Sequence, residues 1–334
     1  MSKYEKITVR LMHGLAEDHE KRRQDGTGTG HEKSCSTKAQ YREEIKRFAR
    51  WAIEQEGRER IAHDRYHELI QRYVDGMTGR LSAYTIHKRL SALCAATHER
   101  LADYRHPRRE RPVKGRERAP ERHHTREEDR ERVTEVARHI GIRRAELCAL
   151  QGRDLIERDG RLLVHVHHGK GGKTHDQLIL PAHEAAVKAL FEGVGERERV
   201  LTGEEAKASI EAATHAQRRL VAREAYAWYL ERPEAEKEAI WRPLMRDRLE
   251  EKHLRRADRD RIDEKEARHR GREDWQREWA MIQKNPIRRC RGDNARELER
   301  QGREPAFDRE AVLFTSIMTL SHYREDVTVT NYLI

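Results

Sequence analysis

Long apolar runs are missing from this sequence. Across its 334 residues, no stretch approaches the ~18 consecutive apolar residues that a membrane-spanning helix needs. The N-terminal segment MSKYEKITVRLMHG also lacks the apolar core of a secretory signal peptide. We therefore expect a cytoplasmic protein with no membrane partner.

Cysteine is also scarce, and the four cysteines are far apart: Cys35, Cys94, Cys148 and Cys290. Disulfide frameworks and zinc sites are built from closely spaced pairs such as C-x-x-C. The spacing therefore predicts reduced thiols and no structural metal.

Apolar residues are few relative to charged ones. The set AVILMFWYC makes up 36% of the chain and the charged residues 39%. Lys and Arg number 70 against 60 Asp and Glu, which gives a net charge of +10. This composition favours elongated helical lobes over one large close-packed sphere, and the basic excess favours a polyanionic partner.

The first part of the chain is typical of a small helical domain, which we place at residues 1–105. Apolar residues recur at helical spacing over 36–55, over 66–76, and again from Ser82, with Leu101 at the end of that third stripe.

A basic segment follows, and we assign 106–124 as a linker. The run 105–123 holds eight Arg or Lys against three Glu, and its three prolines argue against a helix. Composition favours a solvated linker, but such a segment can also follow phosphates. The side chains that we expect to contact phosphates are Arg105, Arg108, Arg109, Arg111, Lys114, Arg116 and Arg118.

A second domain is predicted over 125–334. A capping-box pattern of Thr125 with Glu128 starts a helix that ends at Gly141. The segments RLLVHVHH and THDQLILP flank GKGGK and predict a β-hairpin, and helices are expected at 182–193 and 204–230.

The stretch 246–274 is the most densely charged part of the chain. Of its 29 residues, 11 are basic and 10 acidic, a net of +1. This balance is a poor footprint for DNA and predicts a solvated helix with ion pairs between residues four apart.

Four histidines near the hairpin, His165, His167, His168 and His175, raise the possibility of a metal site. No carboxylate or thiol in the pattern completes a tetrahedral set. We therefore interpret these histidines as solvated or facing a nucleic acid.

Several polar residues acquire meaning from their order in the chain. They are Arg143 in GIRRAELCAL, Lys170 in HHGKGGKTH, His215 and Arg218 in ATHAQRR, and His322 and Tyr332 in the tail LSHYREDVTVTNYL. This order resembles the tyrosine recombinase (phage integrase) family, and in particular the mobile-element integrases whose nucleophilic tyrosine lies close to the C-terminus.

The resemblance implies a fold that is mainly α with a small β-hairpin or sheet. Residues 1–105 would be the helical core-binding (SAM-like) DNA-binding domain, and 125–334 the α+β catalytic domain. Compact family members have a shorter connection between Arg218 and His322, so we interpret residues 232–305 as a charged helical insertion.

The resemblance also implies a role for each residue. Arg143 and Arg218 would hold the two non-bridging phosphate oxygens, and Tyr332 would form a covalent 3′-phosphotyrosine. His215 would accept the tyrosine proton, and Lys170 would protonate the leaving 5′ oxygen. His322 would add a hydrogen bond to the phosphate and Glu146 would orient the site. The covalent intermediate keeps the bond energy for rejoining, so the chemistry needs no metal or other cofactor.

Alternatives remain at three positions. Lys173 could be the acid in place of Lys170, and it is also a candidate DNA contact. Tyr323 could compete with Tyr332, and the box His253-Leu254-Arg255-Arg256 competes with the one that begins at His215. The sequence also departs from the family pattern at Ser321, where glycine is usual before the late histidine.

The expected function is that of a site-specific recombinase for integration or excision of a mobile element. Its partner would be double-stranded DNA recombination sites, bound by a homo-tetramer, with possible accessory DNA-bending proteins, in the nucleoid of a bacterial cytoplasm. The alternatives are a related resolvase and a non-catalytic DNA-binding regulator that kept the fold.

Overall fold

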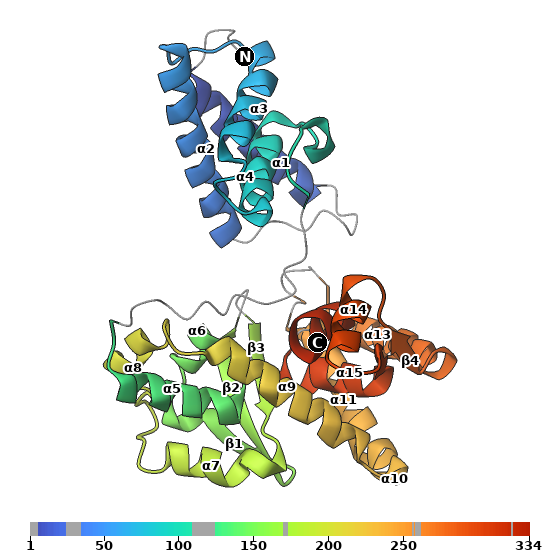
Figure 1. Cartoon of the computed structure of the whole chain (residues 1–334). Coiled ribbons are helices and arrows are strands. Elements are labelled where there is room, and N and C mark those ends of the chain that lie inside the picture. The colour runs from blue at the N-terminus through green and yellow to red at the C-terminus, as the bar shows by residue number, and fades with distance from the viewer. Residues whose placement is uncertain are drawn as a thin grey trace. The chain divides into compact units, whose positions relative to one another are not determined.

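The computed structural model describes residues 6–24, 35–108, 124–169, 173–255, 257, 262–321 and 323–334. The chain divides into two compact units, Met1–Arg111 and Pro112–Ile334, each with a core of its own (Figure 1). The described part is mainly helical, with one three-stranded and one two-stranded antiparallel sheet.

The first unit is a cluster of four α-helices. These are α1 (Ile7–Gln24), α2 (Cys35–Glu56), α3 (Tyr66–Met77) and α4 (Ala83–Thr97), with 3₁₀ turns η1 (His63–Arg65) and η2 (Leu101–Asp103). The three predicted helices are confirmed, except that Leu101 lies beyond α4, in η2.

Helix α1 was not predicted from the sequence, although Ile7, Leu11 and Leu15 follow one another every four residues and are buried. It packs closely on α4, because a Cβ at Gly14 would lie 2.0 Å from the backbone oxygen of Ala96. Only glycine permits this approach.

The second unit begins with helices around a three-stranded sheet. Its first elements are α5 (Glu127–Ile140), α6 (Arg144–Leu147), η3 (Gly152–Asp154), β1 (Leu155–Arg158), β2 (Arg161–Gly169), β3 (Lys173–Leu178), α7 (Pro181–Phe191), α8 (Gly203–Ala208) and α9 (Thr214–Leu230). The predicted hairpin is confirmed as β2 and β3, and β1 extends it to a sheet of order β1-β2-β3.

Alternation along the strands gives this sheet two different faces. One face carries Leu162, Val164 and Val166 into the core formed with α5 and α7. The other carries Leu163 and Leu178 into a core formed with the later helices. His175 pairs with Val166 and lies on the first face, whereas Asp176 pairs with His165 and lies on the second.

Three local predictions for residues 125–230 are wrong. Helix α5 has its N-cap at Arg126, and the Thr125 hydroxyl instead donates to Glu211 at 2.5 Å. The single helix predicted over 204–230 is divided into α8 and α9. The helical repeat of RRLVAREAYAWYL predicts that Leu220 is buried, but Leu220 is 40% exposed and its neighbour Val221 faces the core.

Residues 232–305 form most of the remainder. They contain α10 (Glu234–Glu236), the π-helix η4 (Lys237–Trp241), α11 (Arg242–Leu254), α13 (Glu264–Lys284), β4 (Ile287–Arg289) and α14 (Asp293–Arg300). Helices α11 and α13 pack together, and α11 and η4 bury Trp241, Met245 and Leu249 against the second sheet face. The single helix predicted over 246–274 is wrong, because the Asp263 side chain caps the start of a second helix and the stretch is divided into α11 and α13. The predicted ion pairs four residues apart are present, for example Arg268 with Glu264 at 2.8 Å.

The chain closes with β5 (Ala306–Asp308), which pairs with β4, then α15 (Arg309–Phe314), the π-helix η5 (Thr315–Thr319), α16 (Glu325–Thr328) and the π-helix η6 (Val329–Leu333). Figure 1 shows these red elements gathered beside α9. No helix in the described ranges is both long and apolar enough to cross a membrane.

Candidate active site

Arg143 and Glu146 form a paired unit at the start of α6. The backbone N–H of Arg143 donates to Glu146 Oε2 at 2.9 Å, and Arg143 Nη1 donates to Glu146 Oε1 at 2.6 Å. Burial acts to raise the pKa of Glu146, but the charge of Arg143, its hydrogen bonds and the charge of Arg218 lower that pKa below its ordinary value. The carboxylate is therefore ionised and orients Arg143.

Arg218 lies on α9 and is 1% exposed. Its Nη1 donates to the carbonyl of Gly141 at 2.8 Å and its Nη2 to the carbonyl of Leu320 at 2.7 Å. The guanidinium thus joins the end of α5 to the end of η5. A guanidinium has five N–H donors, so these two bonds leave capacity for an anion.

Gly141 is required for this arrangement. Its φ is +70°, and a Cβ there would lie 2.7 Å from Val221 Cγ1 on α9. Helix α5 therefore ends against α9 only with glycine, and this contact presents the Gly141 carbonyl to Arg218.

Tyr332 lies against both His215 and Arg218. The rings of Tyr332 and His215 are 5.5 Å apart, and the Arg218 guanidinium carbon lies 5.7 Å from the centre of the Tyr332 ring. The tyrosine is 4% exposed and packs against Ala222 and Leu320. Burial lowers the pKa of Arg218, and the hydrogen bond and charge of Tyr332 act in the opposite direction.

Two arginines hold the backbone of the tyrosine segment. Arg223 Nε donates to the carbonyl of Tyr332 at 3.3 Å and its Nη2 to that of Ile334 at 2.7 Å. Arg303 Nη2 donates to the carbonyl of Leu333 at 2.9 Å. The chain thus fixes its own tyrosine beside its own Arg218.

The competing sequence candidates lie in other contacts. His253 Nε2 donates to Asp274 Oδ2 at 2.7 Å, between α11 and α13. The Tyr323 hydroxyl donates to the carbonyl of Arg248 at 3.5 Å, also on α11. The geometry therefore favours His215 over His253 and Tyr332 over Tyr323.

Several predicted residues lie outside the described ones. These are Lys170, His322, Arg109, Arg111, Lys114, Arg116 and Arg118, together with the side chain of Lys173. Lys170 belongs by sequence to the connection between β2 and β3. Arg105 and Arg108 are described and exposed in the first unit. The backbone N–H of Arg105 donates to the side-chain oxygen of Gln71 on α3, and the Gln71 amide donates to the carbonyl of Arg105.

The structure excludes one of the two interpretations of His175, that of a solvated histidine, while the other, that it faces a nucleic acid, stays a prediction. His175 is only 5% exposed. Gln177 lies two residues further along β3, on the same face, and donates to the carbonyl of Ile140 at 2.6 Å. His175 therefore also faces the end of α5, where the site begins. Burial, with the positive charges of Arg143, Arg218 and Arg255, lowers the pKa of His175 to about 4, against the opposing charge of Glu146.

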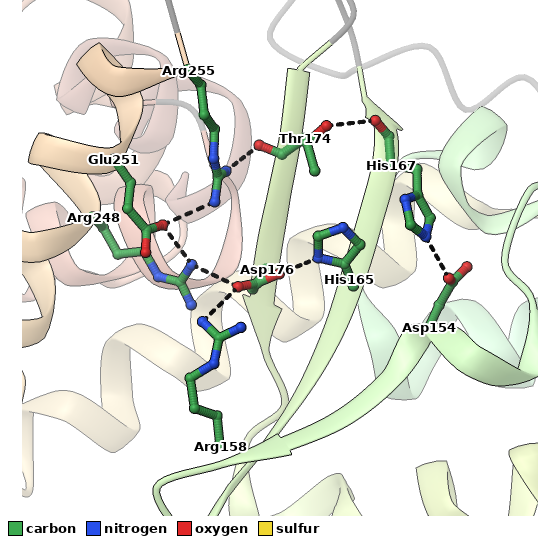
Figure 2. A network of polar contacts seen from close by, with 9 residues as sticks. All are labelled: Asp154, Arg158, His165, His167, Thr174, Asp176, Arg248, Glu251 and Arg255. Atoms are coloured by element: carbon green, nitrogen blue, oxygen red, sulfur yellow. Dashed lines mark hydrogen bonds and ion pairs between the residues drawn. The ribbon is translucent and has the colours of Figure 1, made fainter. Parts of the chain in front are cut away.

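The histidines of the opposite face are paired with carboxylates, which the sequence pattern did not reveal (Figure 2). His165 Nδ1 donates to Asp176 Oδ1 at 2.5 Å, and His167 Nε2 donates to Asp154 Oδ1 at 2.9 Å. Among the described residues no group of three or more His, Cys, Asp or Glu could hold a metal ion.

The backbone around the late histidine position is also unusual. Ser321 has a φ of +49° and Tyr323 a φ of +53°, a left-handed conformation that costs a non-glycine residue about 1 kcal/mol or more.

A comparison with protein-family models, curated proteins and solved structures finds no match to this chain.

Proposed function

We propose that this protein is a site-specific tyrosine recombinase that breaks and rejoins DNA. The observation that carries the proposal is the contact of Tyr332 with His215 and Arg218, beside the Arg143–Glu146 pair. These residues come from three separate segments, α6 with its N-cap, α9 and η6, and the order that suggested the family gave no information on their distances.

The chemistry follows from the residue types. Arg143 and Arg218 bind the non-bridging oxygens of a phosphodiester and stabilise the charge that builds up during attack. The Tyr332 oxygen attacks phosphorus and loses its proton to His215, and the bond from phosphorus to the 5′ oxygen breaks. The leaving 5′ oxygen takes a proton, for which Lys170 is the proposed donor and Lys173 the alternative. Rejoining reverses these steps.

The biological setting is part of the same proposal. The protein would act on paired recombination sites as a homo-tetramer, in integration or excision of a mobile element. The first unit and the basic segment 106–124 would bind the DNA backbone, with Arg105 and Arg108 already exposed for that role.

A suicide-substrate assay tests the chemistry. The full-length protein is incubated with nicked duplexes that tile the DNA on both sides of its gene, and adducts are resolved under denaturing conditions. We expect a covalent protein–DNA band whose modified peptide contains Tyr332, because loss of the short nicked strand prevents rejoining.

The matched variants decide the nucleophile. Tyr332→Phe should remove the adduct completely and keep non-covalent DNA binding, whereas Tyr323→Phe should keep the adduct. Absence of an adduct with every duplex, or an adduct that persists in Tyr332→Phe, would contradict the proposal.

A further inference from the structure

Two buried nitrogen atoms near the Arg143–Glu146 pair have no hydrogen-bond partner among the described residues. They are His175 Nε2 and Arg218 Nε, on side chains that are 5% and 1% exposed. A buried polar group without a partner is costly and rare, and it commonly marks the place of a bound ion or water. Here two such atoms belong to residues that interact electrostatically with each other and with Arg143.

The strand geometry directs the side chain of His175 toward Arg143 and Arg218. Its neighbour on the same face, Gln177, donates to the carbonyl of Ile140. The next carbonyl, that of Gly141, accepts from Arg218, and Arg143 follows two residues later. The end of α5 thus brings β3 and the two arginines to one place.

The residues on either side of His175 are fixed by α11 and by Arg255, the residue that follows it. Arg255 Nη1 donates to the carbonyl of Thr174, and Arg248 Nη1 donates to Asp176 Oδ2 at 3.2 Å (Figure 2). Because both flanking residues are held, the backbone at His175 has little freedom, and the ring is preorganised.

We propose that His175 is a further phosphate-binding residue of the active site, whose Nε2–H donates to a non-bridging oxygen of the scissile phosphate. This inference rests on the proposed function, which supplies the phosphate. A buried imidazole surrounded by two arginines stays neutral at physiological pH, so it offers one N–H donor without adding a third positive charge.

Position and chemistry separate this role from that of a core histidine. A residue that only fills space could be replaced by an apolar side chain of similar size at no cost to the reaction. A residue that binds the phosphate loses a donor in His175→Leu, whereas His175→Gln keeps an N–H close to the position of Nε2.

The test uses the suicide duplex that the wild type cleaves, together with two copies that carry a methylphosphonate at the scissile position. Each diastereomer replaces one of the two non-bridging oxygens with a methyl group. We expect His175→Leu to slow adduct formation on the normal duplex by about a hundred-fold, with DNA affinity unchanged and with partial recovery in His175→Gln.

The decisive outcome is the dependence on the diastereomer. On the one that lacks the oxygen bound by His175, the wild type and His175→Leu should react at nearly equal rates, while the other diastereomer should preserve the difference. An equal loss on all three duplexes, or no loss on the normal one, would show that His175 is structural. A wild type that forms no adduct would instead refute the proposed function, and this inference with it.

Discussion

The two faces of the three-stranded sheet treat their polar side chains in opposite ways. On the face toward α11, Asp176 accepts hydrogen bonds from His165, Arg158 and Arg248, so its charge is neutralised by close partners. On the face toward α5, His175 Nε2 is buried without a partner among the described residues, and so is Nε of Arg218 on α9, the helix that packs on α5. Buried polar groups that all have hydrogen-bond partners stabilise a fold, whereas buried polar groups without partners are typical of a ligand-binding site.

The largest expected effect concerns the satisfied face. Asp176→Asn removes one of the two carboxylates that pair with Arg248, whose side chain is only 9% exposed, and the other, Glu251, remains at 3.1 Å. Loss of one partner of a buried ion pair costs about 3 to 5 kcal/mol, and because Glu251 remains we expect a loss at the lower end, about 3 kcal/mol. Urea unfolding, followed by the fluorescence of the four tryptophans of the second unit, should show this loss.

Arg158→Ala is the matched control for Asp176→Asn. It removes another partner of the same carboxylate, but the side chain of Arg158 is 52% exposed. We expect a loss below about 1 kcal/mol, because solvent screens an exposed pair. Equal losses in the two variants would mean that burial does not determine the strength of this network.

A smaller effect should appear on the unsatisfied face in acid. The pKa of His175 is about 4 when folded, against about 6.5 for a free histidine, because burial disfavours its charged form and Arg143, Arg218 and Arg255 repel it, while Glu146 acts in the opposite sense. The unfolded chain therefore binds a proton below about pH 6.5 that the folded chain does not bind until about pH 4. Folding stability should fall by about 2 to 3 kcal/mol over that window.

His175→Gln cannot take up this proton, so its free energy of unfolding should depend less on pH. Urea unfolding of both proteins at pH 7.5 and pH 4.5 provides the measurement. The stability difference between wild type and His175→Gln should change in favour of the variant at the lower pH. A difference that is the same at both pH values would show that His175 is hydrated and easily protonated.

The smallest expected effect on stability concerns the backbone at Ser321, next to the candidate site. Ser321 has a φ of +49°, and Ser321→Gly should relieve the steric cost, with part of the gain offset by the greater freedom of glycine in the unfolded chain. A net gain of up to about 1 kcal/mol would raise the melting temperature by about 2 to 4 °C. Ser321→Ala, which keeps the Cβ, should show no gain, and an equal gain in both variants would exclude backbone relief as the cause.

Periodicity predicted the elements that are regular over many residues. The apolar repeat through Val133, Val136 and Ile140 predicted α5, and the two runs around GKGGK predicted β2 and β3. Strand β1 was missed because only Leu155 and Ile156 are apolar in it. The Asp159-Gly160 dipeptide, where both residues have positive φ, was the signal that could have revealed the β1–β2 hairpin.

The candidate site could be predicted only in part. Chain order suggested Arg143, Arg218 and Tyr332, but not that Arg218 would be buried between two backbone carbonyls. The position of His175 depends on the register of β3 against β2, and on which face of the sheet packs against α5. The contact of Arg248 with Asp176 joins residues 72 apart in the sequence, and no local pattern encodes a pairing of that range.

The contacts of residues 232–305 bear on more than one part of the site. Arg248 and Arg255 hold β3, while Arg303 and Arg288 hold the C-terminal segment through the Leu333 carbonyl and Glu325. Opening of residues 232–305 therefore releases both β3 and the segment that carries Tyr332. Local unfolding proceeds in cooperative units, and because of these contacts we expect the charged helices and the site to open as one such unit. The fraction of molecules with an assembled site is then set by the opening free energy of helices that carry none of its proposed catalytic groups.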